Sequence, residues 1–194
     1  MSKPLTATVR IDPSPMAKHF QGVWLELPDG KRWLVDYRSR PLWEPFRDEQ
    51  VNVTGAFYAV DAKFQSVNAQ HFRVDRMAFV TPPKQSPPYL EIGPVTTLKG
   101  QFEDRAWPAG SKLAGSTRKL FVDEAGNEYV VADTGETHPT MGPSWSGRRM
   151  VRARPLVVNP AYSSTSSGAH LWIVSVHGIA DPVPEDEGTV TPCP

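Results

Sequence analysis

Hydrophobic and polar residues alternate with a period of two along most of the chain, which is typical of half-buried β-strands. Residues 23–36, VWLELPDGKRWLVD, form two such runs on either side of Asp29-Gly30. Asp-Gly supplies the positive φ angles of a tight turn, so this stretch predicts a β-hairpin. Residues 49–60 (EQVNVTGAFYAV) and 70–80 (QHFRVDRMAFV) continue the alternation, and residues 7–12 (ATVRID) add a candidate first strand.

The second half of the chain repeats this succession. Its candidate strands are VTTLKGQF, the hairpin TRKLFVDEAGNEYVVAD, RRMVRARPLVV and AHLWIVSVHGI. Gly126 aligns with Gly30 at an offset of 96 residues (126 minus 30), which places Tyr129 on Trp33. The last strands align at an offset of 102 (176 minus 74), with Val176 on Val74. The sequence therefore predicts an internal repeat.

Each half offers five short strands, with a hairpin between the second and third and a long crossing before the fourth. The crossings, RPLWEPFRDE and THPTMGPSWSGRR, hold prolines that make a helix there unfavourable. Gly30 with WLVDY, Val51-x-Val53-x-Gly55 after Trp43, and FRVDRM form a pattern that resembles the OB-fold family. The resemblance occurs twice, although Arg154-Pro155 stands where the first half has Thr54-Gly55. It implies small closed Greek-key barrels.

We therefore expect an all-β protein with two five-stranded OB-like barrels in tandem. The predicted units are barrel 1 at residues 1–80, a linker at 81–94, barrel 2 at 95–180 and an acidic, flexible tail at 181–194. The linker holds five prolines in TPPKQSPPYLEIGP and is predicted to be a stiff spacer without a strand. A single β-sandwich built from all ten strands is the alternative fold.

The charge distribution weighs against strong binding to nucleic acid. The formal net charge is zero; residues 5–80 hold ten basic and nine acidic side chains, and residues 95–180 hold nine and seven. Single-strand binding depends on a positive groove that releases counterions. The chain also lacks a run of about 18 apolar residues, a secretory-type N-terminus and a second cysteine beside Cys193, so we expect a cytoplasmic protein without a membrane span or disulfide.

The OB-fold resemblance implies a ligand face on the second and third strands, walled by neighbouring loops. In each unit it brings aromatic and basic residues together, as a surface that stacks nucleic-acid bases would require. The alternative is that these aromatics are core or loop anchors. The residues predicted to bind a ligand or partner on these faces are Phe20, Lys31, Arg32, Trp33, Tyr37, Phe64, Trp107, Tyr129 and Tyr162.

A basic row adds a third candidate surface. Arg148, Arg149, Arg152 and Arg154 lie within seven residues of one predicted strand. Alternation places Arg148, Arg152 and Arg154 outward with Met150, while Val151 and Ala153 point inward. The row predicts contact with phosphates, with an acidic partner or with the chain's own tail, unless it is simply a solvated strand face.

No catalytic motif is present, and no catalytic residue, cofactor or metal site is predicted. The five histidines lack metal-ligand spacing, and neither a phosphate-binding glycine loop nor a Gly-x-Ser-x-Gly motif occurs. The first hypothesis is a non-enzymatic binding or adaptor protein, a subunit of a larger assembly that docks through barrel loops and exposed aromatics. The second is a single-stranded DNA- or RNA-binding protein, and a weaker third is oligosaccharide binding.

Overall fold

The structure is a computed structural model that describes residues 4–12, 22–37, 40–60, 67–83, 87–107, 109–110, 112–132, 147–162 and 168–178. This part of the chain is all-β, with one turn of 3-10 helix, η1. The elements are β1 (Leu5–Ile11), β2 (Val23–Glu26), β3 (Arg32–Asp36), η1 (Glu44–Phe46), β4 (Gln50–Tyr58), β5 (Gln70–Phe79), β6 (Tyr89–Ile92), β7 (Thr96–Ala106), β8 (Thr117–Asp123), β9 (Glu128–Val131), β10 (Arg148–Val158) and β11 (Ala169–Gly178).

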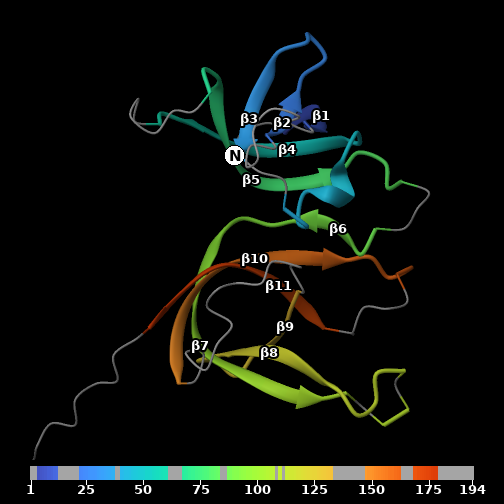
Figure 1. The fold of residues 1–194 in the computed structure, drawn as a ribbon, viewed down its shortest axis with the longest axis vertical. Helices are drawn as coiled ribbons and strands as arrows, with labels where there is room; N and C mark the ends of the chain where they lie inside the picture. The colour runs from blue at the N-terminus through green and yellow to red at the C-terminus, as the bar shows by residue number, and fades with distance from the viewer. Residues whose placement is uncertain are drawn as a thin grey trace, which may run out of the picture.

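Five strands of the first half close into a barrel, in the order β1-β2-β3-β5-β4 and back to β1 (Figure 1). All of these pairs are antiparallel except β3–β5, which is parallel and is limited to Trp33 opposite Gln70 and Leu34 opposite His71. Val9, Leu25, Val51 and Phe46 are almost fully buried inside it. The prediction of an all-β fold with a closed five-stranded barrel is confirmed for this half.

Two tight turns stand where the sequence placed them. Gly30, at φ 83°, closes the β2–β3 hairpin, and Gly126, at φ 82°, closes the turn between β8 and β9. In the second turn the Asp123 carboxylate accepts hydrogen bonds from the backbone N–H groups of Ala125 and Asn127. Glycine is favoured at both positions because L-residues with a side chain rarely adopt these positive φ angles.

Strands of the second half pair in the same order, β7-β8-β9-β11-β10 and back to β7, with the β9–β11 pair again parallel. Strand β6 lies between the two sets and pairs with β5 through Met77 and with β10 through Leu156 (Figure 1). The prediction that residues 81–94 contain no strand is therefore wrong. The four residues Tyr89–Ile92 are free of proline, so their backbone can pair on both edges.

Each set of strands also carries a β-bulge at the same place. The β4–β5 register shifts between Thr54 and Gly55 and leaves Asp75 unpaired. The β10–β11 register shifts between Arg152 and Ala153 and leaves Val174 unpaired. Ala153 therefore occupies the place of Gly55, and Ile173 that of Val74. The predicted offset of 102 is wrong, since the paired strands correspond at an offset of 99 (173 minus 74), and Pro155 lies two residues beyond the bulge.

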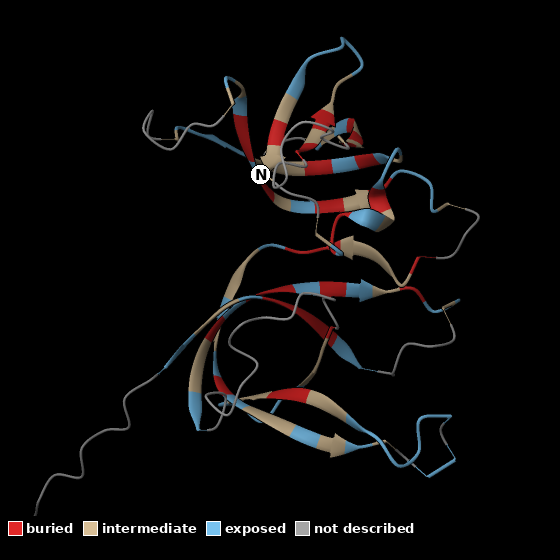
Figure 2. Ribbon diagram, viewed as in Figure 1, coloured by how far each residue is buried: buried red, intermediate tan, exposed pale blue. Residues whose placement is uncertain are grey.

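The buried side chains of the two halves meet rather than forming isolated cores. Ile92 of β6, Leu156 of β10 and Trp172 of β11 pack in the same cluster as the side chains inside the first barrel. Figure 2 shows buried segments on strands on both sides of β6. A second, smaller cluster around Phe121 and Ile173 fills the space between the strands of the second half.

A substitution at Gly55 tests how closely the backbone of β5 approaches β4 at the first bulge. A Cβ atom at Gly55 would lie 2.1 Å from the carbonyl oxygen of Arg73 and 2.7 Å from the Phe72 ring. Because the backbone oxygen cannot move aside, we expect Gly55→Ala to lower the free energy of unfolding by about 1–3 kcal/mol, measured by urea denaturation. Gly178→Ala is the control, since its Cβ would meet only Arg149 Nη1, at 3.6 Å. Equal stability of the two variants would contradict the close approach.

Candidate functional site: a pocket between the two halves

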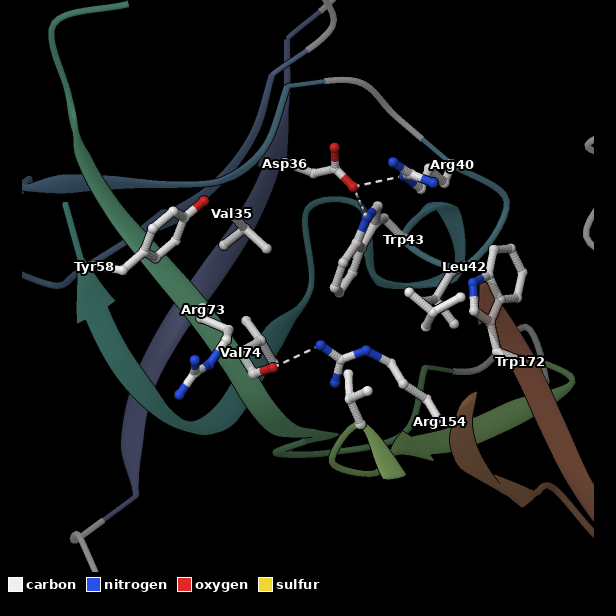
Figure 3. A pocket seen from close by; sticks show the side chains of 12 residues that line it. Val35, Asp36, Arg40, Leu42, Trp43, Tyr58, Arg73, Val74, Arg154 and Trp172 are labelled. Atoms are coloured by element: carbon white, nitrogen blue, oxygen red, sulfur yellow. Dashed lines mark hydrogen bonds and ion pairs between the residues drawn. The ribbon is translucent and has the colours of Figure 1, made fainter. Parts of the chain in front are cut away.

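A pocket of about 420 Å3 lies where the first barrel meets strands of the second half (Figure 3). Its size falls in the range of small-ligand sites, about 300–1,000 Å3. It is formed by the end of β3, the segment that leads to η1, the end of β4, and parts of β5, β10 and β11. The lining residues are Val35, Asp36, Arg40, Leu42, Trp43, Tyr58, Arg73, Val74, Val95, Arg154, Trp172 and Val174.

Arg154 is the buried charge of this pocket, with 8% of its surface exposed. Its Nη1 donates to the carbonyl oxygens of Gly93, at 2.9 Å, and Asp75, at 3.3 Å, and its Nη2 donates to that of Val74, at 2.8 Å. Strand β5 pairs with β3 only as far as His71 and with β6 only from Met77, so its edge is unpaired between them. The guanidinium therefore satisfies carbonyl groups that the sheet leaves open at the bulge.

The charge of Arg154 is only partly compensated. Burial lowers the pKa of Arg154 below its ordinary value, and the nearby Asp75 carboxylate opposes this shift. Among the described residues no carboxylate forms an ion pair with Arg154; its hydrogen-bond acceptors are backbone carbonyls. An arginine stays protonated at neutral pH even so. The pocket thus contains a buried cation that faces dipoles rather than an opposite charge.

One wall is fixed by the carboxylate at the end of β3. Asp36 Oδ2 accepts hydrogen bonds from Arg40 Nε at 2.7 Å and from Trp43 Nε1 at 3.2 Å (Figure 3). These contacts hold residues 40–43 against the barrel, with Leu42 and Trp43 buried. The carboxylate of Asp36 is therefore engaged by its own wall and leaves the pocket with an excess of positive charge from its arginines.

The rim combines apolar and basic groups. Tyr58 at the end of β4 is 42% exposed, and Val174, the bulge residue of β11, is 39% exposed. Burial, followed by the influence of Tyr37 and Asp36, raises the pKa of the Tyr58 hydroxyl, so it stays protonated at neutral pH. Arg73 projects from β5 as an exposed side chain, with its Nε 3.5 Å from Asp75. Exposed apolar side chains that gather in one patch, rimmed by polar groups, are a common feature of binding surfaces.

In the first half, the structure separates the residues predicted to share a ligand face. Trp33 is partly buried and packs against the barrel core, where its ring stacks on Phe72 at 5.2 Å between centroids, an arrangement that matches the core-anchor alternative. Its neighbour Arg32 lies over the Trp24 ring, at 4.8 Å, and forms an ion pair with Asp12. Leu25 faces Trp33 across the β2–β3 pair and is buried, which explains the inward position.

The other predicted residues of this half are engaged locally or lie outside the described part. Lys31 forms an ion pair with Asp29 in the hairpin turn. The Tyr37 hydroxyl lies 2.5 Å from Nε2 of the buried His71, close to the pocket but not among its lining residues. Phe20 and Phe64 lie outside the described residues.

In the second half, the predicted aromatics are spread over separate places. Trp107 lies 5.3 Å from the guanidinium of Arg118, and the Tyr129 hydroxyl donates to Asp123 at 3.2 Å. Burial, together with Asp123, raises the pKa of Tyr129. Tyr162 is half-buried after β10, where its N–H donates to the carbonyl of Asn159. These aromatics do not line the pocket.

The basic row is only partly exposed. Val151 and Ala153 are fully buried, as predicted, and Arg152 is exposed, but Arg154 is not. Arg148 pairs with Glu124, and Arg149 is half-buried and donates to the carbonyl of Arg148. The prediction of an exposed Arg154 is wrong because β5 and the segment after β6 cover the face of β10 from which it projects.

Most of the pocket had no signal in the sequence. Asp36, Arg40 and Trp43 are close in the sequence, but Tyr58, Arg73 and Trp172 come from other strands, and the OB-like pattern did not predict that these side chains meet in a pocket. Within the described ranges, no group of three or more His, Cys, Asp or Glu side chains could hold a metal ion. None of the helical structure found there is long and apolar enough to cross a membrane.

Comparisons with protein-family models, with curated proteins and with solved structures found no match to this chain. The site is therefore interpreted from its own residues.

Arg154 and Arg152 give a matched test of the buried contact. Arg154→Met removes three hydrogen bonds and leaves carbonyl groups of β5 and Gly93 unsatisfied. We expect a loss of at least about 3 kcal/mol in the free energy of unfolding, because each of the three unpaired carbonyl groups costs about 1–3 kcal/mol. Arg152→Met, two residues away and exposed, is expected to change it by less than about 0.5 kcal/mol. Thermal and urea unfolding measure the stability of both variants. If Arg154→Met leaves the free energy of unfolding unchanged, Arg154 has no structural role at the junction.

Proposed function

We propose that this chain is a non-enzymatic binding protein, a subunit or accessory component of a larger assembly, and that a partner protein docks over the pocket between its two halves. One observation carries the proposal. The pocket has buried tryptophans at its base, Trp43 and Trp172, and exposed apolar side chains on its rim, Tyr58 and Val174. Buried pockets with aromatic walls are where protein interfaces concentrate binding energy.

We further propose that the architecture is a tandem of two OB-like barrels, residues 1–80 and 95–180, joined through residues 81–94 and followed by the acidic tail 181–194. The identical pairing order of the two sets of strands and their matching bulges support this duplication. Strand β6 then belongs to the connection between the barrels. OB-like barrels commonly serve as binding modules.

The charge arrangement favours a protein partner over a nucleic-acid strand. Most arginines outside the pocket in the described part of the chain have carboxylate partners, among them Arg10 with Glu26, Arg32 with Asp12 and Arg105 with Glu128. A single strand would require a continuous track of cations that can release counterions. Catalysis also has little support, because the carboxylate of Asp36 already accepts hydrogen bonds from Arg40 and Trp43.

Single-stranded nucleic acid is the second candidate, favoured by the arginines and aromatic rings that line the same pocket. Fluorescence anisotropy with labelled oligonucleotides at low salt distinguishes the two proposals. Tight, salt-dependent binding at low salt would favour this candidate over a protein partner.

Two rim substitutions test protein docking. The full chain, tagged and incubated with lysate of the organism that makes it, is expected to capture a partner protein identified by mass spectrometry. Tyr58→Ser and Val174→Ser are expected to reduce the captured amount at least tenfold, because each removes an exposed apolar contact. Leu113→Ser, at a leucine that is exposed at least as much and lies away from the pocket, is the control and should leave capture unchanged.

Light scattering after size-exclusion chromatography measures the molar mass of the species that contains this chain and can contradict the proposal of a larger assembly. A lone 21.5 kDa species in purified protein and in native lysate would end the proposal. Equal capture by the wild type, the rim variants and the Leu113 variant would move the docking surface away from the pocket.

A further inference from the structure

We propose that the pocket recognises a carboxylate on a short apolar segment of the partner protein, with Arg154 at its base and Arg73 at its rim as the two cationic contacts. This inference rests on the proposed function and specifies the chemistry of the docked segment. It arises from the hydrogen-bond capacity of Arg154, from the charge of the lining residues and from the apolar walls beside them.

Arg154 has donor capacity that the protein does not use. A guanidinium carries five N–H groups in a fixed plane. The structure gives Arg154 three contacts, from Nη1 to two carbonyls and from Nη2 to one, and none of its contacts within the described chain uses Nε. The remaining N–H groups belong to a side chain that lines the pocket (Figure 3). A carboxylate matches such donors in shape and charge.

The lining charges favour a single anion. Arg40, Arg73 and Arg154 line the pocket, and Asp36 is the lining carboxylate. Asp36 is paired with Arg40, and the Asp75 carboxylate lies near both Arg73 and Arg154, so these two arginines together retain an excess of one positive charge. Arg73 has only a long contact to Asp75, 3.5 Å, in an exposed position. An incoming carboxylate therefore meets two cations in a partly buried site, where charge interactions are stronger than in water.

The apolar walls of the pocket indicate which side chains flank the carboxylate in the docked segment. Leu42, Trp43 and Trp172 form a buried apolar surface next to Arg154. Tyr58 and Val174 continue this surface to the exposed rim. An aromatic or aliphatic side chain beside an acidic residue fits this combination, whereas a fully polar anion leaves the apolar walls in contact with water.

A polyanion fits less well, because two of the arginines around Arg73 and Arg154 are already paired with carboxylates. Arg76, three residues beyond Arg73 on β5, forms an ion pair with Glu91 at 3.0 Å. On the other side, Arg40 is held by Asp36 at 2.7 Å. The positive charge is therefore local, as expected for one carboxylate, and does not extend into a track for successive phosphates.

The test uses two synthetic probes that differ in one group, acetyl-Gly-Phe-Glu-Phe-Gly-amide and the same peptide with glutamine in place of glutamate. The full chain, labelled with 15N, is titrated with each at low salt. The Nε–H signal of Arg154, assigned through Arg154→Lys, reports on the site directly. We expect the glutamate peptide to bind about tenfold more tightly than the glutamine peptide, since it alone supplies a negatively charged acceptor for the guanidinium, and to shift this signal.

Arg73 and Arg76 give matched variants on one strand. Both side chains are exposed, each has one carboxylate partner, and only Arg73 lines the pocket. Arg73→Gln is expected to weaken binding of the glutamate peptide about three- to tenfold, while Arg76→Gln leaves it unchanged. Neither substitution removes a buried contact, so the comparison stands even if variants of Arg154 fail to fold.

The outcomes separate this inference from the proposed function. Equal binding of both peptides, or equal effects of Arg73→Gln and Arg76→Gln, would overturn the carboxylate contact. The proposed function would still stand if Tyr58→Ser and Val174→Ser reduce capture of a partner protein. A shift of the Arg154 signal by an eight-residue oligothymidylate at lower concentration than by the glutamate peptide would assign the pocket to nucleic acid and overturn the inference. If a synthetic peptide of residues 179–194 shifts the Arg154 signal and binds more tightly than the glutamate peptide, the occupant of the pocket is the chain's own tail and not a partner protein.

Discussion

The hydrogen bonds from Arg154 to the carbonyls of Val74, Asp75 and Gly93 are the contact on which the junction between the two halves depends. A bulge turns the carbonyls of β5 away from regular pairing, and neither β3 nor β6 reaches them. An unsatisfied buried carbonyl is costly, so a long donor from another strand is required there. Arg154 reaches this edge from β10 and fixes the second set of strands against the first barrel.

The strand β6 makes the same junction with backbone groups. Glu91 and Ile92 pair with β5 on one edge, Tyr89, Glu91 and Ile92 pair with β10 on the other, and Ile92 is fully buried between Met77 and Leu156. Beyond Ala153 the partner of β10 on this edge changes from β7 to β6. Gly93, next to β6, both donates to the Pro155 carbonyl and accepts from Arg154, so side-chain and backbone contacts reinforce one another.

Local signals predicted the strands and turns well, and non-local contacts explain what was missed. Asp29-Gly30 and Ala125-Gly126 determine their turns through residues a few positions apart, and alternation identified ten strands. Strand β6 was missed because its stability comes from pairing with distant strands, which outweighs the surrounding prolines. The orientation of Arg154 away from buried Ala153 followed from alternation, but its burial depends on β5, nearly eighty residues earlier. The pocket could not be predicted, since its residues meet only after folding.

Arg154 both joins the two halves and lines the pocket, so an anion that bound there would also affect how the halves are held together. Its charge is buried against carbonyl dipoles, which compensate a cation less fully than a carboxylate does. An anion bound in the pocket of the folded chain stabilises the state in which Arg154 is held at the junction, by an amount set by its concentration relative to Kd. The pocket itself exists only while β3, β5, β10 and β11 stay together. An anion that binds in the pocket is therefore expected to stabilise the attachment of the two halves as well.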